Sequence, residues 1–448
     1  MEIKEPLCRM SYPARMMEQA PELLAPVGNQ RHLEMAIAYG ADAVYAGPPR
    51  YSLRVRNNSF RDAEALAEAI RYTHAHGRRF YLVLNIAPHN DKIRSALRDL
   101  EPLIATGPDA LIMSDPGLIM LVREHWPDMP IHLSVQANAV NWATLEFWRR
   151  QGLERVILSR ELSLDEIEAM RGQVPGMELE VFVHGALCMA YSGRCLLSGY
   201  MNHRDANQGA CTNACRWSYT PQASTHDSSG DLIPLHQEDG ERSMLVEEAG
   251  RPGESVPMHE DEHGTYIMNS KDLRAVQHVE RLCRMGVDSL KIEGRTKSPY
   301  YVARTVQVHR RAIDDAMAGR AFDRTLMDEL EALSNRGYTE GFLRRHPPAE
   351  YQRYEAGTSL LGTRQWVGEV IAREGDWLCI EAKNRFECGD WLELMTPAGN
   401  HWFQPSTLLS ERDHQSVPSA PGSGHRVWLQ APVADVLPET ALLIRSVV

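Results

Sequence analysis

Four of the eight cysteines fall within one short stretch of the chain. They are Cys188, Cys195, Cys211 and Cys215, in the order Cys-x6-Cys-x15-Cys-x3-Cys. Four thiolates can bind a tetrahedral zinc ion or an iron–sulfur cluster. Zinc sites usually combine two closely spaced cysteine pairs, and only the second pair is closely spaced here. The cluster therefore indicates metal or redox chemistry, with buried structural cysteines as the alternative.

A second pattern invites a different interpretation. Residues His259–His263 match the His-Glu-x-x-His sequence of zinc peptidases, which works when both histidines lie on one face of a helix. Here Pro257 precedes the pattern, Gly264 follows it, and acidic residues fill it. We therefore expect no catalytic zinc there, and a metallopeptidase that uses His259 and His263, or a cysteine-bound metal, is kept only as an alternative.

The elements that position these residues alternate over residues 20–320. Eight runs rich in Val, Ile, Leu and Tyr are short enough to be buried parallel strands. They are Glu22–Pro26, Ala43–Ala46, Phe80–Ile86, Ala110–Met113, Ile131–Val135, Arg155–Leu158, Leu179–Val183 and Ser289–Ile292. Amphipathic segments between or after them predict helices at Asp62–His76, Lys92–Ala105, Trp142–Gln151, Leu164–Arg171, Lys271–Met285 and Ser298–Met317.

Eight β-then-α units predict an α/β fold, a (β/α)8 TIM-like barrel over residues 21–320. An open doubly wound sheet is the structural competitor, but no Gly-x-Gly-x-x-Gly follows the first strand to support a dinucleotide fold. A long insertion after the seventh strand, residues 185–265, begins with the cysteine cluster. Residues 1–20 form an N-terminal extension and 321–356 a connector, and the short alternating strands of 357–448 predict a small all-β barrel domain.

Polar or ionisable residues follow nearly every predicted strand, where the active site of a barrel enzyme lies. Some have structural alternatives, since Ser114 and Asp115 could be helix N-caps and the arginines a solvated loop. Arginine can bind a carboxylate or phosphate with two parallel hydrogen bonds. The substrate-binding candidates are Arg50, Arg54, Arg56, Asn85, Gln136, Asn138, Arg160 and Arg295, and the proton-transfer candidates are Glu161, His184 and Glu293.

Composition limits the possible partners. The 448 residues include 48 Lys and Arg against 60 Asp and Glu, a net charge of −12. A protein that binds nucleic acid with its whole surface would be basic, so any RNA must be bound by a local basic patch. No apolar run is long enough for a membrane span, and the N-terminus has no apolar segment typical of a secretory signal. We expect a cytoplasmic protein without a membrane partner.

The stretch EVFVHGALCMAYSGRCLLS, residues 180–198, resembles the signature of the collagenase-like peptidase family, a U-type peptidase family. The resemblance covers nearly the whole chain from residue 21, through ELLAPVGN, NQGACTNACRW and SLKIEGRTKS to ELMTPAGN. It is strongest to the branch of that family that hydroxylates the wobble uridine of certain tRNAs at carbon 5 in a prephenate-dependent reaction.

The resemblance implies a (β/α)8-like barrel with a C-terminal β domain, and a [4Fe–4S] cluster held by the four clustered cysteines. It implies 5-hydroxyuridine as product, the tRNA anticodon loop and prephenate as bound partners, and a need for the iron–sulfur assembly machinery. Arg344 and Arg345 are candidates for contact with the tRNA backbone. An alternative within the family is oxygen-independent hydroxylation of a small aromatic ubiquinone precursor, although those relatives resemble only the barrel.

Overall fold

The computed structural model describes most of the chain. It covers residues 19–48, 50–53, 59–188, 191–195, 198, 206–208, 271–294, 297–344, 362–433 and 436–447. It also gives the backbone of five short strands in the insertion: β8 (Ser224–His226), β9 (Leu232–Pro234), β10 (Arg242–Glu247), β11 (Ser255–Asp261) and β12 (Gly264–Tyr266).

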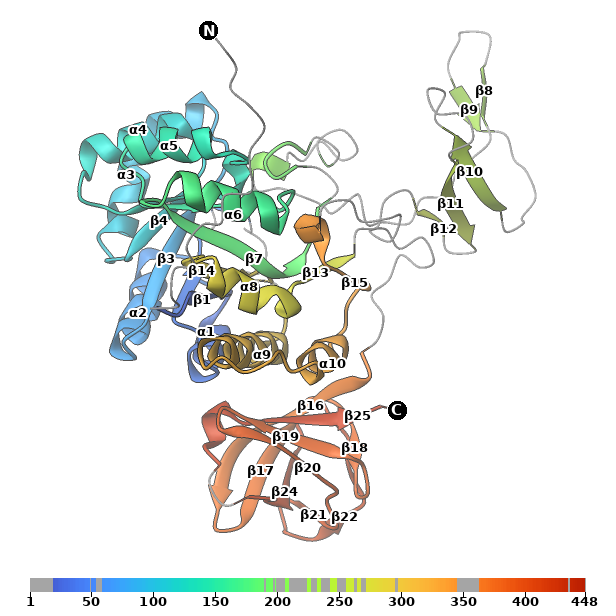
Figure 1. Ribbon diagram of the computed structural model, residues 1–448. Coiled ribbons are helices and arrows are strands. Elements are labelled where there is room, and N and C mark those ends of the chain that lie inside the picture. Colours follow the sequence, from blue (N-terminus) through green and yellow to red (C-terminus); the bar gives the residue numbers. More distant parts are fainter. Residues whose placement is uncertain are drawn as a thin grey trace, which may run out of the picture.

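Eight parallel strands close into a barrel, which confirms the predicted fold (Figure 1). The closing strand pairs in parallel with both the first and the seventh strand. The barrel strands are β1 (Glu22–Pro26), β2 (Ala43–Ala46), β3 (Arg79–Leu84), β4 (Ala110–Met113), β5 (Ile131–Leu133), β6 (Arg155–Ile157), β7 (Glu178–Ala186) and β14 (Ser289–Ile292). Their near-continuous burial explains why they are apolar runs without alternation.

Helices follow the strands and cover the barrel (Figure 1). Several begin at an N-cap that the sequence encodes; Asp115, for example, accepts a 2.8 Å hydrogen bond from the Leu118 amide. The capping alternative is therefore correct for Asp115. The helices are α1 (Gln30–Ala38), α2 (Ala63–Ala75), α3 (Asn90–Ile104), α4 (Pro116–His125), α5 (Trp142–Arg150), α6 (Leu164–Gln173), α8 (Val279–Arg284), α9 (Pro299–Met317) and α10 (Thr325–Glu331).

Strand β7 is longer than its neighbours and pairs with two strands besides β6. Its pairing with β14 shifts register between Phe182 and His184. Beyond this irregularity it pairs antiparallel with β13 (Asp272–Arg274), which lies beside β15 (Tyr338–Thr339). The helix predicted for Lys271–Met285 is therefore wrong in its first half, because pairing with β7 makes Asp272–Arg274 a strand before the short helix η4 (Val276–His278) and α8.

The C-terminal part is all-β, as predicted. Eight of its strands form one sheet in the order β20-β19-β25-β16-β17-β24-β21-β22, and β18 pairs with β23. The strands are β16 (Arg364–Glu374), β17 (Trp377–Ala382), β18 (Phe386–Glu387), β19 (Leu392–Thr396), β20 (Gly399–Phe403), β21 (Leu408–Ser410), β22 (Ser416–Val417), β23 (Ser419–Ala420), β24 (Arg426–Gln430) and β25 (Leu442–Ser446).

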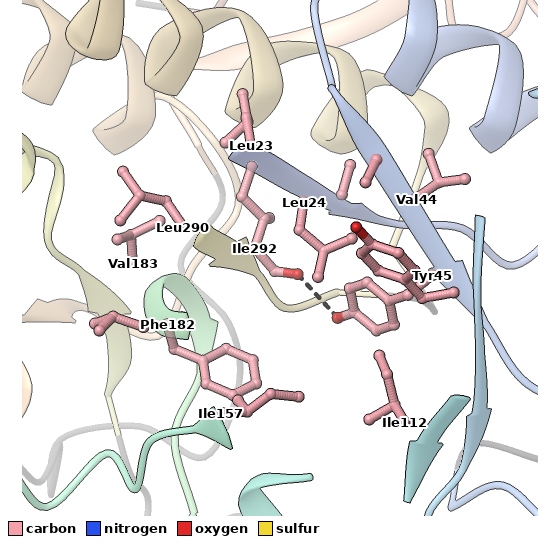
Figure 2. Close-up of a cluster of buried hydrophobic side chains, with 14 of the residues drawn as sticks. Leu23, Leu24, Val44, Tyr45, Ile112, Ile157, Phe182, Val183, Leu290 and Ile292 are labelled. Atoms are coloured by element: carbon pink, nitrogen blue, oxygen red, sulfur yellow. Dashed lines mark hydrogen bonds between the residues drawn. The ribbon is translucent and has the colours of Figure 1, made fainter. Parts of the chain in front are cut away.

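Apolar side chains of the barrel strands and helices form one buried core, which continues into the β domain. Figure 2 shows side chains of β1, β2, β7 and β14 packed together, with the Tyr45 hydroxyl donating to the Ile292 carbonyl at 2.9 Å. Met395, Leu442 and Ile444 of the β domain belong to the same buried cluster as the barrel core. None of the helices in the described ranges is both long enough and apolar enough to cross a membrane.

Candidate active site at the barrel mouth

Three residues from neighbouring barrel strands or the segments that follow them meet at the carboxyl end of the barrel. The Arg160 guanidinium, after β6, lies 3.9 Å from the centroid of the Phe182 ring on β7. The same guanidinium lies 3.6 Å from the Glu293 carboxylate, after β14, and the two charged side chains are only 11% and 13% exposed. The structure thus brings together the predicted residues Arg160 and Glu293, with an aromatic face that sequence reasoning missed.

A second polar cluster lies beside β5 and β6. Asn138 is held in the left-handed region, with φ of 59°, and its amide oxygen lies 2.9 Å from the Ser159 hydroxyl. The Ser159 hydroxyl is also within hydrogen-bond distance of the Glu161 carboxylate. Ser159 therefore links two predicted site residues. Its position directly before Arg160 and Glu161 was the sequence signal for this role.

The cysteine-bearing segment folds back onto this end of the barrel. Gly193, with φ of +73°, packs so closely that an added Cβ would overlap the Gln136 carbonyl oxygen. The Asn207 side-chain amide donates to the Cys195 backbone carbonyl at 3.2 Å. The Asn207 backbone carbonyl accepts a 3.0 Å hydrogen bond from the amide of Ala87, which follows β3. The insertion therefore places the Cys195 backbone at the barrel mouth.

Two of the four clustered cysteines lie within the described residues. Cys188, at the end of β7, is exposed, Cys195 is half-buried, and both are free thiols. Cys211 and Cys215 lie outside the described residues, and within those residues no group of three His, Cys, Asp or Glu side chains could hold a metal ion. Thiols such as those of Cys188 and Cys195 are the kind of donor that binds an iron–sulfur cluster. The other two cysteines that would complete the donor set lie outside the described residues.

Asn85 has a supporting place in the mouth. Its side-chain oxygen accepts from the Leu53 amide at 3.2 Å, and its amide nitrogen lies 3.4 Å from the Ser134 hydroxyl. These contacts join the loops that follow β2, β3 and β5. The side chain of Gln136 is half-buried beside Gly193.

His184 does not face the barrel mouth with Arg160 and Glu161. The register shift after Phe182 turns it outward, where its ring centroid lies 5.4–5.7 Å from those of Tyr301, His309 and Tyr338. The side chain is buried, neither ring nitrogen has a hydrogen-bond partner among the described residues, and burial lowers its pKa well below the usual value. This placement contradicts direct proton transfer to a substrate by His184.

Of the three arginines of the predicted arginine loop, Arg50 is the one that lies within the described residues. Arg50 points to helix α3, where its guanidinium lies 2.7 Å from the Asp99 carboxylate, which also accepts from the Tyr51 hydroxyl at 2.7 Å. This carboxylate holds the Arg50 guanidinium against α3. Arg344 pairs with Glu340 at 2.6 Å. Arg54, Arg56, Arg295 and Arg345 lie outside the described residues.

Charged residues inside the barrel were also missed. Arg155 of β6 lies 2.6 Å from Glu22 of β1 and 3.3 Å from Glu180 of β7, and Lys291 of β14 lies 2.7 Å from Glu180. All four side chains are buried. Because they come from four strands around the barrel, they meet in its interior. The signal was available: each stands within an apolar run that was read as a buried strand.

The His-Glu-x-x-His pattern does not lie on a helix. His259 lies in strand β11, opposite Ser243 of β10 and Tyr266 of β12, while His263 lies outside the described residues. Residues of a strand alternate between two faces, so the helical spacing that this zinc motif needs is not present. The described strand therefore gives no support to the histidine-based peptidase alternative.

Comparison with protein families identifies both parts of the chain. The sequence profile of peptidase family U32 matches residues 28–353, and that of the peptidase family U32 C-terminal domain matches residues 363–445.

Curated relatives match almost the full length. The chain is 59% identical to the tRNA hydroxylation protein P of Escherichia coli K12, over 95% of this chain and 97% of that protein. It is 56% identical to the protein of the same name from Haemophilus influenzae, over 96% of each. A more distant relative is the 23S rRNA 5-hydroxycytidine C2501 synthase of Escherichia coli, at 28% identity over 93% of this chain and 57% of that protein.

Proposed function

This chain belongs to peptidase family U32, and from that membership we propose that it is an enzyme that hydroxylates tRNA. The observation that carries the proposal is 59% identity, over 95% of the chain, to a protein named for tRNA hydroxylation. The C-terminal domain is included in that match, so the similarity is not confined to a common barrel.

We propose carbon 5 of the wobble uridine as the atom that is hydroxylated, giving 5-hydroxyuridine. A relative named as a 5-hydroxycytidine synthase supports reaction at carbon 5 of a pyrimidine in RNA. An enzyme that modifies a base must take it out of its stack, and an anticodon loop offers bases that are already unpaired. The mouth offers polar groups at Asn138, Ser159 and Glu161 to hold such a base. They lie beside Arg160, whose guanidinium covers the buried Phe182 ring.

The proposed cofactor is a [4Fe–4S] cluster bound by Cys188, Cys195, Cys211 and Cys215. When bound, such a cluster supplies a redox centre whose potential depends on hydrogen bonds and burial. The contact of Gly193 with Gln136 supports this placement, because it brings the cysteine segment to the barrel end where the proposed base-binding groups lie. The iron–sulfur assembly machinery would be needed to load it.

We propose that prephenate binds at the mouth as a cosubstrate or activator of the hydroxylation. Its two carboxylates require cationic partners. Arg160 is the described candidate, since its guanidinium stands at the mouth and can form forked hydrogen bonds. Glu293, at 3.6 Å from Arg160, would share or yield that guanidinium when a carboxylate binds.

The test measures modified nucleosides in tRNA. Cells that lack the protein are complemented with the wild type or with Cys211→Ala, grown with and without oxygen, and their bulk tRNA is analysed by mass spectrometry. We expect 5-hydroxyuridine-derived nucleosides to disappear and to return only with the wild type. The purified Cys211→Ala protein should also lack iron–sulfur absorbance. Unchanged tRNA under both growth conditions, or a fully active Cys211→Ala variant, would overturn the proposal.

A further inference from the structure

A cleft of about 890 Å³ lies between the barrel and the β domain. On the barrel side it is bounded by the start of α9 and the residues that follow α10, and on the other side by strand β16 and the turn that follows β17. Its lining residues are Lys297, Ser298, Tyr300, Tyr301, Leu333, Ser334, Gly362, Thr363, Arg364, Gln365, Trp366, Asn384 and Val447.

The charge of this cleft is opposite to that of the chain. Its described lining includes the cation Lys297 and no carboxylate, although the chain carries a net charge of −12. Arg364 also lines the cleft, but its guanidinium lies 3.3 Å from Glu393, which lines the neighbouring cavity. Two other cavities lined by described residues, of about 460 and 530 Å³, include acidic groups such as Asp42 and Asp314. A cleft with cations and without acids favours a polyanion as its occupant.

The uncharged residues that line the cleft indicate which class of polyanion it would bind. Trp366 is partly buried, with its indole nitrogen donating to the Gly368 carbonyl at 3.0 Å, so the ring is held in place. Gln365 and Asn384 supply amide groups, and Arg364 lies 5.0 Å from the ring centroid of Trp402 outside the cleft. Aromatic rings beside cations and amides are the groups that bind single-stranded nucleic acid, by stacking on bases and contact with phosphates.

The cleft also adjoins the candidate active site. Lys297 follows Glu293 by only four residues, and its amide donates to the Gly294 carbonyl at 3.0 Å. Its ammonium group lies 5.4 Å from the centroid of the Tyr301 ring, whose hydroxyl holds the Glu293 carbonyl at 2.8 Å. A strand with one base in the barrel mouth could therefore continue along Lys297 towards the β domain.

We propose that this interdomain cleft binds the single-stranded RNA next to the nucleotide that enters the barrel mouth. The inference rests on the proposed function and extends it: the C-terminal domain becomes part of the RNA-binding surface, and Lys297 and Trp366 become binding residues. The occupant is RNA, and a small anionic metabolite in the cleft would be a competing outcome.

The experiment measures affinity for unmodified tRNA across a range of salt concentrations. Lys297→Glu should weaken binding about tenfold and lower the slope of log affinity against log salt by about one, as expected when one phosphate contact is lost. Trp366→Leu should weaken binding about tenfold without changing the slope, since stacking is not ionic. Arg373→Glu is the matched control, because this β-domain arginine donates to the Gly375 carbonyl in the β16–β17 hairpin and makes the same change in charge.

Unfolding temperatures and tRNA hydroxylation in cells are measured for the same variants. If Lys297→Glu and Trp366→Leu leave the affinity and the salt slope unchanged while the wild type hydroxylates tRNA, the proposal that the cleft binds RNA is overturned. The proposed function would still stand. Loss of prephenate binding alone would identify a metabolite site and also overturn the proposal that the cleft binds RNA. Wild-type protein that binds tRNA through these residues but never hydroxylates it would contradict the proposed function instead.

Discussion

Two buried histidines that contact each other, His184 on β7 and His309 on α9, make the folded state sensitive to acid. His309 is fully buried, and burial lowers its pKa to about 4 despite its hydrogen bond to the Thr305 carbonyl at 2.8 Å. An unfolded chain has a histidine pKa of about 6.5, so it takes up the proton first as the pH falls. The contribution of His309 to the free energy of unfolding is therefore fully present above pH ~6.5. It falls by about 3 kcal/mol as the pH drops towards ~4.

Thermal unfolding at a series of pH values tests this residue. The unfolding temperature of the wild type should fall between pH ~6.5 and ~4, and that of His309→Gln should fall less steeply because glutamine does not titrate. His76→Gln, at an exposed position directly after α2, is the control and should follow the wild type. Parallel curves for all three proteins would contradict the assignment of the acid sensitivity to His309.

At the scale of elements, the cysteine segment depends on one close contact with the barrel. Gly193 and Gly107 both have positive φ, at +73° and +81°, so both carry the strain that an L-residue would meet there. Only Gly193 faces a clash, with the Gln136 carbonyl, because nothing lies within 4 Å of a Cβ at Gly107. Gly193→Ala should therefore displace the segment that bears Cys188 and Cys195, while Gly107→Ala should cost only about 1 kcal/mol of stability.

The measurement compares the iron content and the unfolding temperature of the two glycine variants. On the proposed [4Fe–4S] assignment, Gly193→Ala should lose most of the iron–sulfur absorbance while the barrel keeps its far-ultraviolet circular dichroism. Gly107→Ala should retain the iron of the wild type. Equal iron in both variants would mean that docking of the segment on the mouth does not position the cysteines.

Elements encoded by local pattern were predicted well, and those set by distant partners were not. Ala43–Ala46, Ala110–Met113 and Ser289–Ile292 were predicted to the residue, because a short apolar run in a barrel wall is legible in sequence. Asp272–Arg274 was predicted as helix, since its pairing with β7 is a contact between segments far apart in the chain. The side to which His184 points was missed for a similar reason, because a register shift reverses the alternation of a strand.

The candidate site, like the elements, was predicted only in part from the sequence. Arg160 and Glu293 meet as expected at the carboxyl end of the barrel, from the ends of β6 and β14, the strands on either side of β7. Arg50 does not join them, because Asp99 of α3 captures it, and that contact depends on how the loop after β2 folds. The interior pair Lys291 and Glu180 was passed over because charged residues within apolar runs were not weighed as partners across the barrel.

At the scale of the whole molecule, the two domains are joined by a buried ion cluster that no sequence pattern indicated. The Arg304 guanidinium on α9, with no exposed surface, lies 2.7 Å from Glu393 of β19 and 2.9 Å from Glu329 of α10. Glu393 also lies 3.3 Å from Arg364. Around this cluster the Tyr39 hydroxyl donates to the β domain, and Met395 and Ile444 continue the barrel core. The domains are therefore expected to unfold together.

Removing the shared carboxylate tests this coupling. Glu393→Gln leaves Arg304 buried with only Glu329 as a charged partner, and breaking a buried ion pair typically costs about 3–5 kcal/mol. The matched control is Asp390→Asn, because the Asp390 carboxylate is partly exposed and 3.7 Å from Arg445, where a pair contributes about 0–1 kcal/mol. Calorimetry should show one transition in the wild type, little change in Asp390→Asn, and in Glu393→Gln a lower or divided transition as the β domain loses its anchor on α9. A Glu393→Gln transition as high and as single as that of the control would show that the apolar interface alone couples the domains, and the cleft beside Arg364 would then keep its shape without the ion cluster.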